Sequence, residues 1–225
     1  MECNVTGKHI LENARVSGNA RVTDKASVSG HARVMGDARV SDRASVLDRA
    51  WVMENARVSG SALVTGNAWV VGDARVSDNA LVADNAWVVG DALVSGNASV
   101  LGKVWVMDNA RVSDNAAVLN NALVAGNASV SGNASVAGDA RVLGDASVSG
   151  NARIYGIMRS DGYCFVYVPC KDGKWRVITG CRYFTMDEAK MHWSAPGYKN
   201  AKLAAETLVI LECLEKLRAV KPEGV

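Results

Sequence analysis

Two kinds of side chain that could bind ligands recur in this sequence at intervals of 18 residues. The arginines are Arg21, Arg39, Arg57 and Arg75, with Arg111 a further 36 residues along the chain, and the tryptophans are Trp51, Trp69, Trp87 and Trp105. Guanidinium groups bind phosphates and carboxylates, and indole rings offer large apolar surfaces to ligands or to other proteins. For either set to act together, the fold must bring residues 18 positions apart onto one surface.

A six-residue repeat provides that arrangement. An aliphatic residue recurs every six positions from Ile10 to Ile154, and an alanine stands two residues before it from Ala14 to Ala152, except at Val104. The unit V-x-G-N-A-x occurs 24 times in residues 13–156 without an insertion. Residues two apart share one side of a strand, and the Gly-Asn pair favours a corner. Three strands per 18 residues predict a three-sided β-solenoid of eight coils, about 38 Å long.

These repeats also resemble a known family. Runs such as Gly18-Asn19-Ala20-Arg21-Val22 and Gly126-Asn127-Ala128-Ser129-Val130 are similar to those of hexapeptide-repeat, left-handed parallel β-helix proteins. The best-known members of that family are trimeric acyltransferases, and the N-A-x-V-x-G variant looks more like uncharacterised phage and prophage proteins. The resemblance implies the left hand of the helix and a trimer. Handedness does not follow from the periodicity itself.

The fold class predicted is an all-β left-handed parallel β-helix with a small C-terminal α+β (ββαα) cap. Residues 1–12 are expected to form a lead-in segment or N-terminal cap, residues 13–156 the β-helix, and residues 157–225 the C-terminal module. The chain has 225 residues, of which 49% are hydrophobic, so simple disorder is excluded. No stretch approaches 18 consecutive apolar residues, and the start of the chain lacks a signal-peptide pattern. The five cysteines are an odd and sparse set, which is typical of reduced thiols. Together, these features predict a cytoplasmic protein, which would lie in the host cytosol if it is phage-encoded.

One outward side of the predicted prism, here called the tryptophan face, carries two columns of large residues. One column reads Arg15, Arg33, Trp51, Trp69, Trp87, Trp105, Leu123 and Arg141, and the other includes Met35, Met53 and Met107. Four tryptophans could offer about 600–1,000 Å² of apolar surface. Soluble monomers seldom expose a contiguous patch of that size. We therefore expect this face to be covered by another subunit or, alternatively, by a carbohydrate, a nucleobase or a partner protein.

A second side, here called the leucine face, is apolar at the same axial level but has smaller side chains. Its larger members include Leu63, Leu81 and Leu101. A ring closes when one patch of each subunit packs on a different patch of its neighbour. The large tryptophans of one prism would suit the leucine and alanine surface of the next. We therefore predict a homotrimer of parallel prisms.

The third side, here called the arginine face, carries the arginine column beside a column of serine and threonine. A ladder of arginines about 5 Å apart could bind phosphates. Four of these arginines are followed three positions later by an acid, namely Asp24, Asp42, Asp78 or Asp114. We expect these acids to neutralise the arginines as a solvated surface of ion pairs. Arg57, which is followed by Gly60, lacks such a partner and is the candidate anion-binding residue.

No catalytic constellation is evident on the prism. The acyltransferases of the resembled family use a histidine on the prism and loops inserted between coils, and this repeat has no insertion. His31 stands at a corner, where we expect it to replace the usual asparagine of a turn, and His9 matches no motif. The sequence therefore predicts no catalytic residue, no cofactor and no enzymatic activity. The formal net charge of +2 makes no case for binding to nucleic acid or membranes.

Composition changes after residue 156. Residues 163–169 and 175–179 are expected to form a β-hairpin, and Thr185 and Glu188 form a capping box that begins a helix ending near Trp193. A longer helix is expected from about Asn200 to Ala219, with one apolar side formed by Leu203, Ile210, Leu211, Leu214 and Leu217. This module should cover the open end of the solenoid.

The cysteines of the C-terminal module, and its pair Arg182 and His192, could each have a structural role or form a binding site. Cys164, Cys170, Cys181 and His192 suggest zinc, but their spacings lack a C-x-x-C pair, so we expect buried free thiols and no metal. Arg182 and His192 lie near aromatic residues in the sequence. A structural hydrogen bond is the favoured interpretation for them, and a small polar pocket is the alternative.

From these observations we predict a non-enzymatic, phage- or prophage-encoded trimeric protein that binds an unidentified host protein or small ligand, for example to counter host defence. A trimeric acyltransferase acting at subunit boundaries is the first alternative. A structural phage component is the second. The predicted partners of the binding protein are copies of itself and the captured molecule. No binding to a membrane is predicted.

Overall fold

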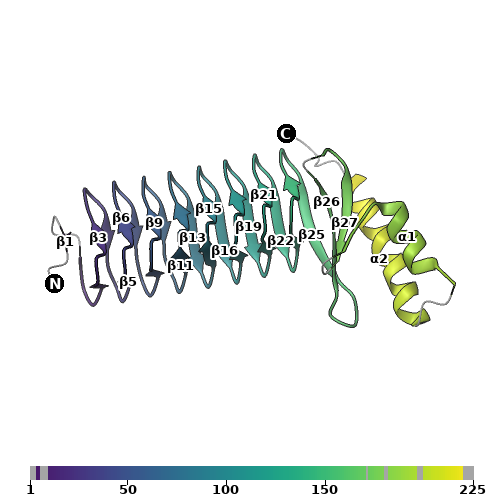
Figure 1. The fold of residues 1–225 in the computed structure, drawn as a ribbon, viewed down its shortest axis with the longest axis horizontal. Coiled ribbons are helices and arrows are strands. Elements are labelled where there is room, and N and C mark those ends of the chain that lie inside the picture. The colour runs from purple at the N-terminus through teal and green to yellow at the C-terminus, as the bar shows by residue number, and fades with distance from the viewer. Residues whose placement is uncertain (1–3, 6–9, 171, 180–181, 197–199, 220–225) are drawn as a thin grey trace.

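The computed structural model describes residues 4–5, 10–170, 172–179, 182–196 and 200–219. Within these residues the chain forms a left-handed parallel β-helix of about eight three-sided coils, with a module of strands and two helices at its C-terminal end (Figure 1). The predicted solenoid and its 18-residue coil are confirmed. Cys3, His9 and Cys181 lie outside the described residues.

Three parallel sheets form the sides of the prism. The tryptophan face consists of β2 (Arg15–Val16), β5 (Arg33–Val34), β8 (Trp51–Val52), β11 (Trp69–Gly72), β14 (Trp87–Gly90), β17 (Trp105–Val106), β20 (Leu123–Val124) and β23 (Arg141–Val142). The arginine face consists of β1 (Asn4–Val5), β3 (Arg21–Val22), β6 (Arg39–Val40), β9 (Arg57–Val58), β12 (Arg75–Val76), β15 (Leu93–Val94), β18 (Arg111–Val112), β21 (Ser129–Val130) and β24 (Ser147–Val148). The leucine face begins with β4 (Ser27–Val28), β7 (Ser45–Val46), β10 (Leu63–Val64), β13 (Leu81–Asp84), β16 (Ser99–Gly102), β19 (Ala117–Asn120), β22 (Ser135–Gly138) and β25 (Arg153–Met158).

The register within each sheet places residues 18 apart opposite one another. Trp69, for example, lies opposite Trp51 on one side and Trp87 on the other. The core of the prism consists of the valine and alanine columns, which are almost completely buried from Ala20 to Val148. Val104, which replaces an alanine, is buried as well. Because the inside of the prism is filled by these small side chains, the larger residues of the repeat all lie on its outer surface.

The corners depend on residues with left-handed backbone. Gly102 has φ +96°, and a Cβ at this position would lie 2.6 Å from the carbonyl oxygen of Asn120 in the next coil. Other corners have an aspartate in this conformation, such as Asp42 with φ 61°. Aspartate tolerates left-handed backbone better than most residues. The strict sequence position of Gly, Asp or Asn therefore follows from the corner.

The C-terminal module continues the sheet of the leucine face. β26 (Cys164–Pro169) pairs antiparallel with β25 and with β27 (Trp175–Thr179), and β27 pairs with β28 (Arg182–Phe184), which completes an 11-stranded sheet. Val166, Val168 and Ile178 pack in one cluster with the valine and alanine core. The predicted hairpin is confirmed, and it covers the last coil. β28 is a further strand that the sequence analysis did not predict.

Two helices cover the far side of this module. α1 (Met186–Ser194) begins at the predicted capping box, in which Thr185 and Glu188 exchange side-chain and backbone hydrogen bonds. α2 (Ala201–Ala219) packs against α1 and β26, with Leu211 fully buried. Leu217 was expected on the buried side but is 49% exposed, so that assignment is wrong.

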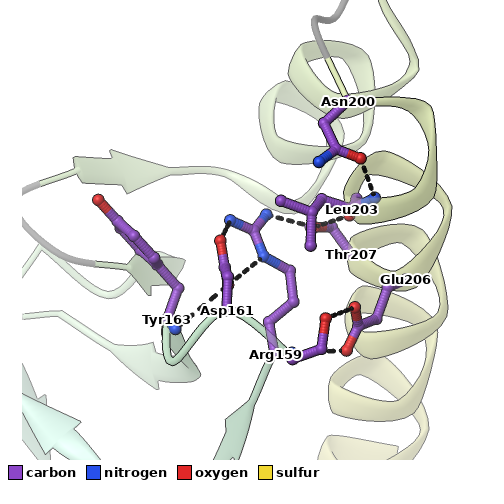
Figure 2. A network of polar contacts seen from close by, with 8 residues as sticks. Arg159, Asp161, Tyr163, Asn200, Leu203, Glu206 and Thr207 are labelled. Atoms are coloured by element: carbon purple, nitrogen blue, oxygen red, sulfur yellow. Dashed lines mark hydrogen bonds and ion pairs between the residues drawn. The ribbon is translucent and has the colours of Figure 1, made fainter.

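A network of polar contacts joins α2 to the turn after β25 (Figure 2). The guanidinium of Arg159, which is 6% exposed, donates two hydrogen bonds to the carboxylate of Asp161, at 2.9 and 2.7 Å, and one of 2.8 Å to the hydroxyl of Thr207. Glu206 accepts hydrogen bonds from the backbone amide and the hydroxyl of Ser160. These contacts hold the long helix against the end of the prism.

Candidate binding surfaces

The four tryptophans of the tryptophan face form one continuous stack. Neighbouring ring centroids are 4.7, 4.7 and 4.9 Å apart, and the ring planes differ by only 6–8°. The guanidinium of Arg33 lies 4.5 Å above the ring of Trp51, and Leu123 is the cross-strand neighbour of Trp105. The parallel register produces this geometry, because identical residues lie opposite one another in successive coils.

Stacking changes what the tryptophan face can bind. The indole rings cover one another's faces, so that Trp51, Trp69 and Trp87 are half-buried and only Trp105 is exposed, at 41%. The area expected from four separate rings is therefore an overestimate. A sugar or nucleobase platform requires an open ring face. The arrangement instead presents a row of ring edges, flanked by Met35, Met53 and Met107, which are also half-buried.

The leucine face offers a second apolar strip at the same coils. Leu63, Leu81 and Leu101 are half-buried, and Ala83 is 9% exposed. Leu63 is paired with Leu81, and Leu101 is paired with Ala83. The strip is thus straight and shallow, in contrast to the row of tryptophan edges.

The arginine face brings the predicted arginine column together. Arg21, Arg39, Arg57 and Arg75 lie opposite one another on four successive strands, and all four side chains are exposed. Leu93 follows Arg75 and separates it from Arg111. Among the described residues, none of these arginines forms an ion pair with a carboxylate. The expectation of a surface of ion pairs is therefore wrong.

The aspartates that follow the arginines three positions later have other hydrogen-bond partners. The carboxylates of Asp42, Asp78 and Asp114 accept hydrogen bonds of 2.9–3.0 Å from the backbone amides of the glycines 18 residues later, in the next coil. Asp24 accepts a longer one, of 3.3 Å, from the amide of Asp42. The sequence contained a signal for this role, because each of these aspartates occupies the glycine position of the repeat, where the corner requires left-handed backbone.

In the C-terminal module, Arg182 and His192 contact each other. The Arg182 guanidinium lies 2.9 Å from Nε2 of His192, and the imidazole ring packs against Phe184 and Trp193. Because a guanidinium can only donate, Nε2 accepts in this contact. The Arg182 side chain is exposed, and its contact connects β28 to α1.

The described thiols and His31 have different surroundings. The Cys164 thiol donates to the carbonyl oxygen of Asp139 at 3.0 Å, and burial raises the pKa of this thiol to about 11. Cys170 is buried and Cys213 is exposed. Within the described ranges, no three His, Cys, Asp or Glu side chains are grouped so that they could hold a metal ion. His31 is exposed at a corner, where its backbone amide donates to the backbone carbonyl oxygen of Asp48 in the next coil.

Two segments of the prism match a known family of repeats. Residues 14–30 and 74–90 match the family model of the YdcK β-solenoid repeat. The prism resembles a YdcK-type solenoid. No curated protein matches the chain. Of the two described helices, neither has the length and hydrophobicity needed to cross a bilayer.

Solved structures similar to this chain are hexapeptide-repeat proteins. UDP-N-acetylglucosamine acyltransferase from Campylobacter jejuni is 15% identical, with a TM-score of 0.45 over 65% of this chain and 71% of that one. A hexapeptide transferase family protein from Anaplasma phagocytophilum is 15% identical, with a TM-score of 0.41 over 89% of each chain. UDP-N-acetylglucosamine O-acyltransferase from Moraxella catarrhalis is 11% identical, with a TM-score of 0.36 over 93% of this chain and 94% of that one.

Proposed function

We propose that this protein is a non-enzymatic, homotrimeric binding protein, in which the tryptophan face of each prism packs on the leucine face of the next. The observation that carries this proposal is the tryptophan stack, with its ring faces covered and its edges directed outward. Such a stack is a preformed, rigid ridge, and a second protein surface can cover ring edges that a sugar cannot stack upon. The phage or prophage origin and the capture of a host factor stay predictions from the sequence resemblance.

The geometry of the two apolar faces supports the choice of a second copy as the occupant. Both strips run parallel to the prism axis, because each is built from residues paired 18 apart. Trp69 and Leu63 belong to the same coil, so a neighbour related by a rotation about a parallel axis meets the ridge at the correct height. Two different patches in contact form a heterologous interface, which closes into a ring.

The charged residues of the tryptophan face lie toward its ends, and one of them, Arg33, covers the ring of Trp51. Arg15 and Arg141 are exposed, and they flank the apolar middle that runs from Met35 to Met107. Exposed polar rims around a desolvated apolar centre are typical of protein interfaces.

The test is the solution mass of the full chain by light scattering. We expect about three times 23.7 kDa for the wild-type protein. Trp69→Glu and Leu81→Glu should each abolish the trimer, whereas Ser95→Glu, with the same charge change on the arginine face, should leave it intact. Circular dichroism checks that each variant retains the solenoid. A wild-type monomer would overturn the proposal.

Mixing the two broken variants tests the geometry itself. Trp69→Glu retains an intact leucine face, and Leu81→Glu retains an intact tryptophan face. A heterologous interface therefore predicts a dimer of the two variants, which has one intact contact and cannot close into a ring. If each face instead packed against its own copy, Leu81→Glu would remain oligomeric alone, and mixing would form no such pair.

A further inference from the structure

The arginine face contains four like charges in direct register, without partner carboxylates among the described residues. Arg21, Arg39, Arg57 and Arg75 are cross-strand neighbours. Strands in a sheet are about 4.8 Å apart. Like charges directly opposite one another destabilise a sheet. Repulsion within a ladder of four arginines therefore makes the free energy of folding less favourable, and a bound anion would reduce that repulsion.

The local surroundings of Arg57 favour an anion from outside the chain. The coil of Arg57 has Gly60 at the corner position where the neighbouring coils have Asp42 and Asp78. The carboxylates of Asp42 and Asp78 accept hydrogen bonds from the backbone amides of Gly60 and Gly96. Ser59 lies beside Arg57 on the same outward surface and is half-buried. The centre of the ladder thus has guanidinium donors and a hydroxyl, and the carboxylate at its corner, that of Asp42, is bonded to the amide of Gly60.

We infer that the arginine face, from Arg21 to Arg75, binds an acidic polysaccharide that carries carboxylates on successive sugar residues. The inference rests on the proposed function as a binding protein and names the ligand class. Guanidinium groups bind carboxylates in bidentate fashion, and one group per coil matches a ligand with one carboxylate per repeating unit. The adjacent column of Thr23, Ser41, Ser59 and Ser77 can exchange hydrogen bonds with sugar hydroxyls.

The same face disfavours nucleic acid as the ligand. Proteins that bind single strands stack bases on aromatic side chains beside a basic groove, and neither outward column of this face contains an aromatic residue. Acids lie along both edges of the arginine column. Asp37, Glu54 and Asp73 are exposed toward the tryptophan face, and Asp24, Asp42 and Asp78 are exposed toward the leucine face. These acids leave a positive strip one side chain wide. A single file of carboxylates fits that strip, whereas the two phosphate backbones of a duplex would meet the acids.

The test measures the affinity of the full-length protein for polygalacturonate and for its defined oligomers by calorimetry at low salt. We expect affinity to rise with oligomer length up to about the span of the four coils, and to fall as salt screens the charges. The triple variant Arg39→Gln/Arg57→Gln/Arg75→Gln should bind about tenfold more weakly or worse, since exposed charge pairs contribute modestly each. The matched control Arg49→Gln/Lys103→Gln/Arg153→Gln removes the same charge from exposed positions outside the ladder and should bind as the wild type does.

Three results would overturn the inference. The first is no binding of polygalacturonate at low salt, and the second is an equal loss of affinity in the ladder variant and the control. The third is tighter binding of oligothymidylate or polyphosphate than of polygalacturonate, which would assign the ladder to another polyanion. Solution mass measured on the same samples separates this inference from the proposed function, because the ladder variants leave both apolar faces unchanged.

Discussion

The carboxylate of Asp42 accepts a hydrogen bond of 2.9 Å from the backbone amide of Gly60 in the next coil. Asp42 has φ 61°, so one residue both turns a corner and satisfies an amide of the following corner. The same relationship, with bonds of 2.9–3.1 Å, recurs at Asp48, Asp78, Asp84, Asp108 and Asp114. Acids of this repeat therefore connect successive coils, and the described arginines of the ladder form no direct ion pair with them.

Asp42→Ala should destabilise the solenoid by about 1–2 kcal/mol, because it removes a hydrogen bond to a backbone amide and places alanine in left-handed backbone. Asp42→Asn should cost less, since asparagine tolerates this conformation and retains an oxygen acceptor. Urea unfolding followed by circular dichroism measures both variants. Equal stability of Asp42→Ala and the wild type would show that the Asp42–Gly60 contact contributes nothing.

Arg57→Gln should raise the melting temperature at low ionic strength, because Arg57 lies between Arg39 and Arg75 and like charges oppose one another. The gain should disappear near 1 M salt, where the Debye length is only about 3 Å. Arg153→Gln, an exposed arginine outside the ladder, is the control. If Arg57→Gln melts at or below the wild-type temperature at low salt, the ladder carries no uncompensated repulsion.

The repeat made most of the fold predictable, because a period of six with buried valine and alanine places short strands and corners at fixed positions, although the left hand followed only from the family resemblance. The position of the tryptophans on a common face followed from their spacing of 18. Their mutual stacking did not, since sequence spacing gives a neighbour but not the orientation of its ring. The partner of Asp42 was also missed: sequence proximity suggested Arg39, whereas the corner conformation directs the carboxylate along the prism axis to the next amide. Strand β28 was not predicted, because it has only three residues and begins with a charged one, Arg182.

Cys164 and Cys213 should differ strongly in reactivity toward iodoacetamide. Burial raises the pKa of the Cys164 thiol to about 11, so almost none of it is thiolate near neutral pH, and its thiol donates to Asp139. Cys213 is exposed on α2. Peptide mass spectrometry should find Cys213 modified first and Cys164 modified only after unfolding. Rapid labelling of Cys164 in the folded protein would contradict the packing of β26 on the last coil.

Asp172 should titrate with a pKa of about 2, against its ordinary value of 3.8, because the Arg176 guanidinium donates to its carboxylate. A lowered pKa in the folded state means that this carboxylate stabilises the hairpin above about pH 4, and that the contribution is lost as the pH falls toward 2. Arg176→Gln should return the pKa toward 3.8, as measured by carbon NMR of the side-chain carboxyl. An unchanged pKa in that variant would exclude Arg176 as the cause.

Arg159→Met should loosen α2 from the end of the prism. The Arg159 side chain is 6% exposed and joins Asp161 to Thr207 of α2, so its removal breaks three hydrogen bonds and leaves the Thr207 hydroxyl with only its bond to Leu203. Because Asp161 retains access to solvent, the cost should be about 2–3 kcal/mol, below that of a fully buried ion pair. Hydrogen exchange should accelerate in residues 201–217 while the prism amides keep their protection.

Arg141→Met, at an exposed arginine that forms no ion pair among the described residues, is the control. Equal exchange of α2 in both variants would mean that the apolar contacts around Leu211 hold the helix without this network.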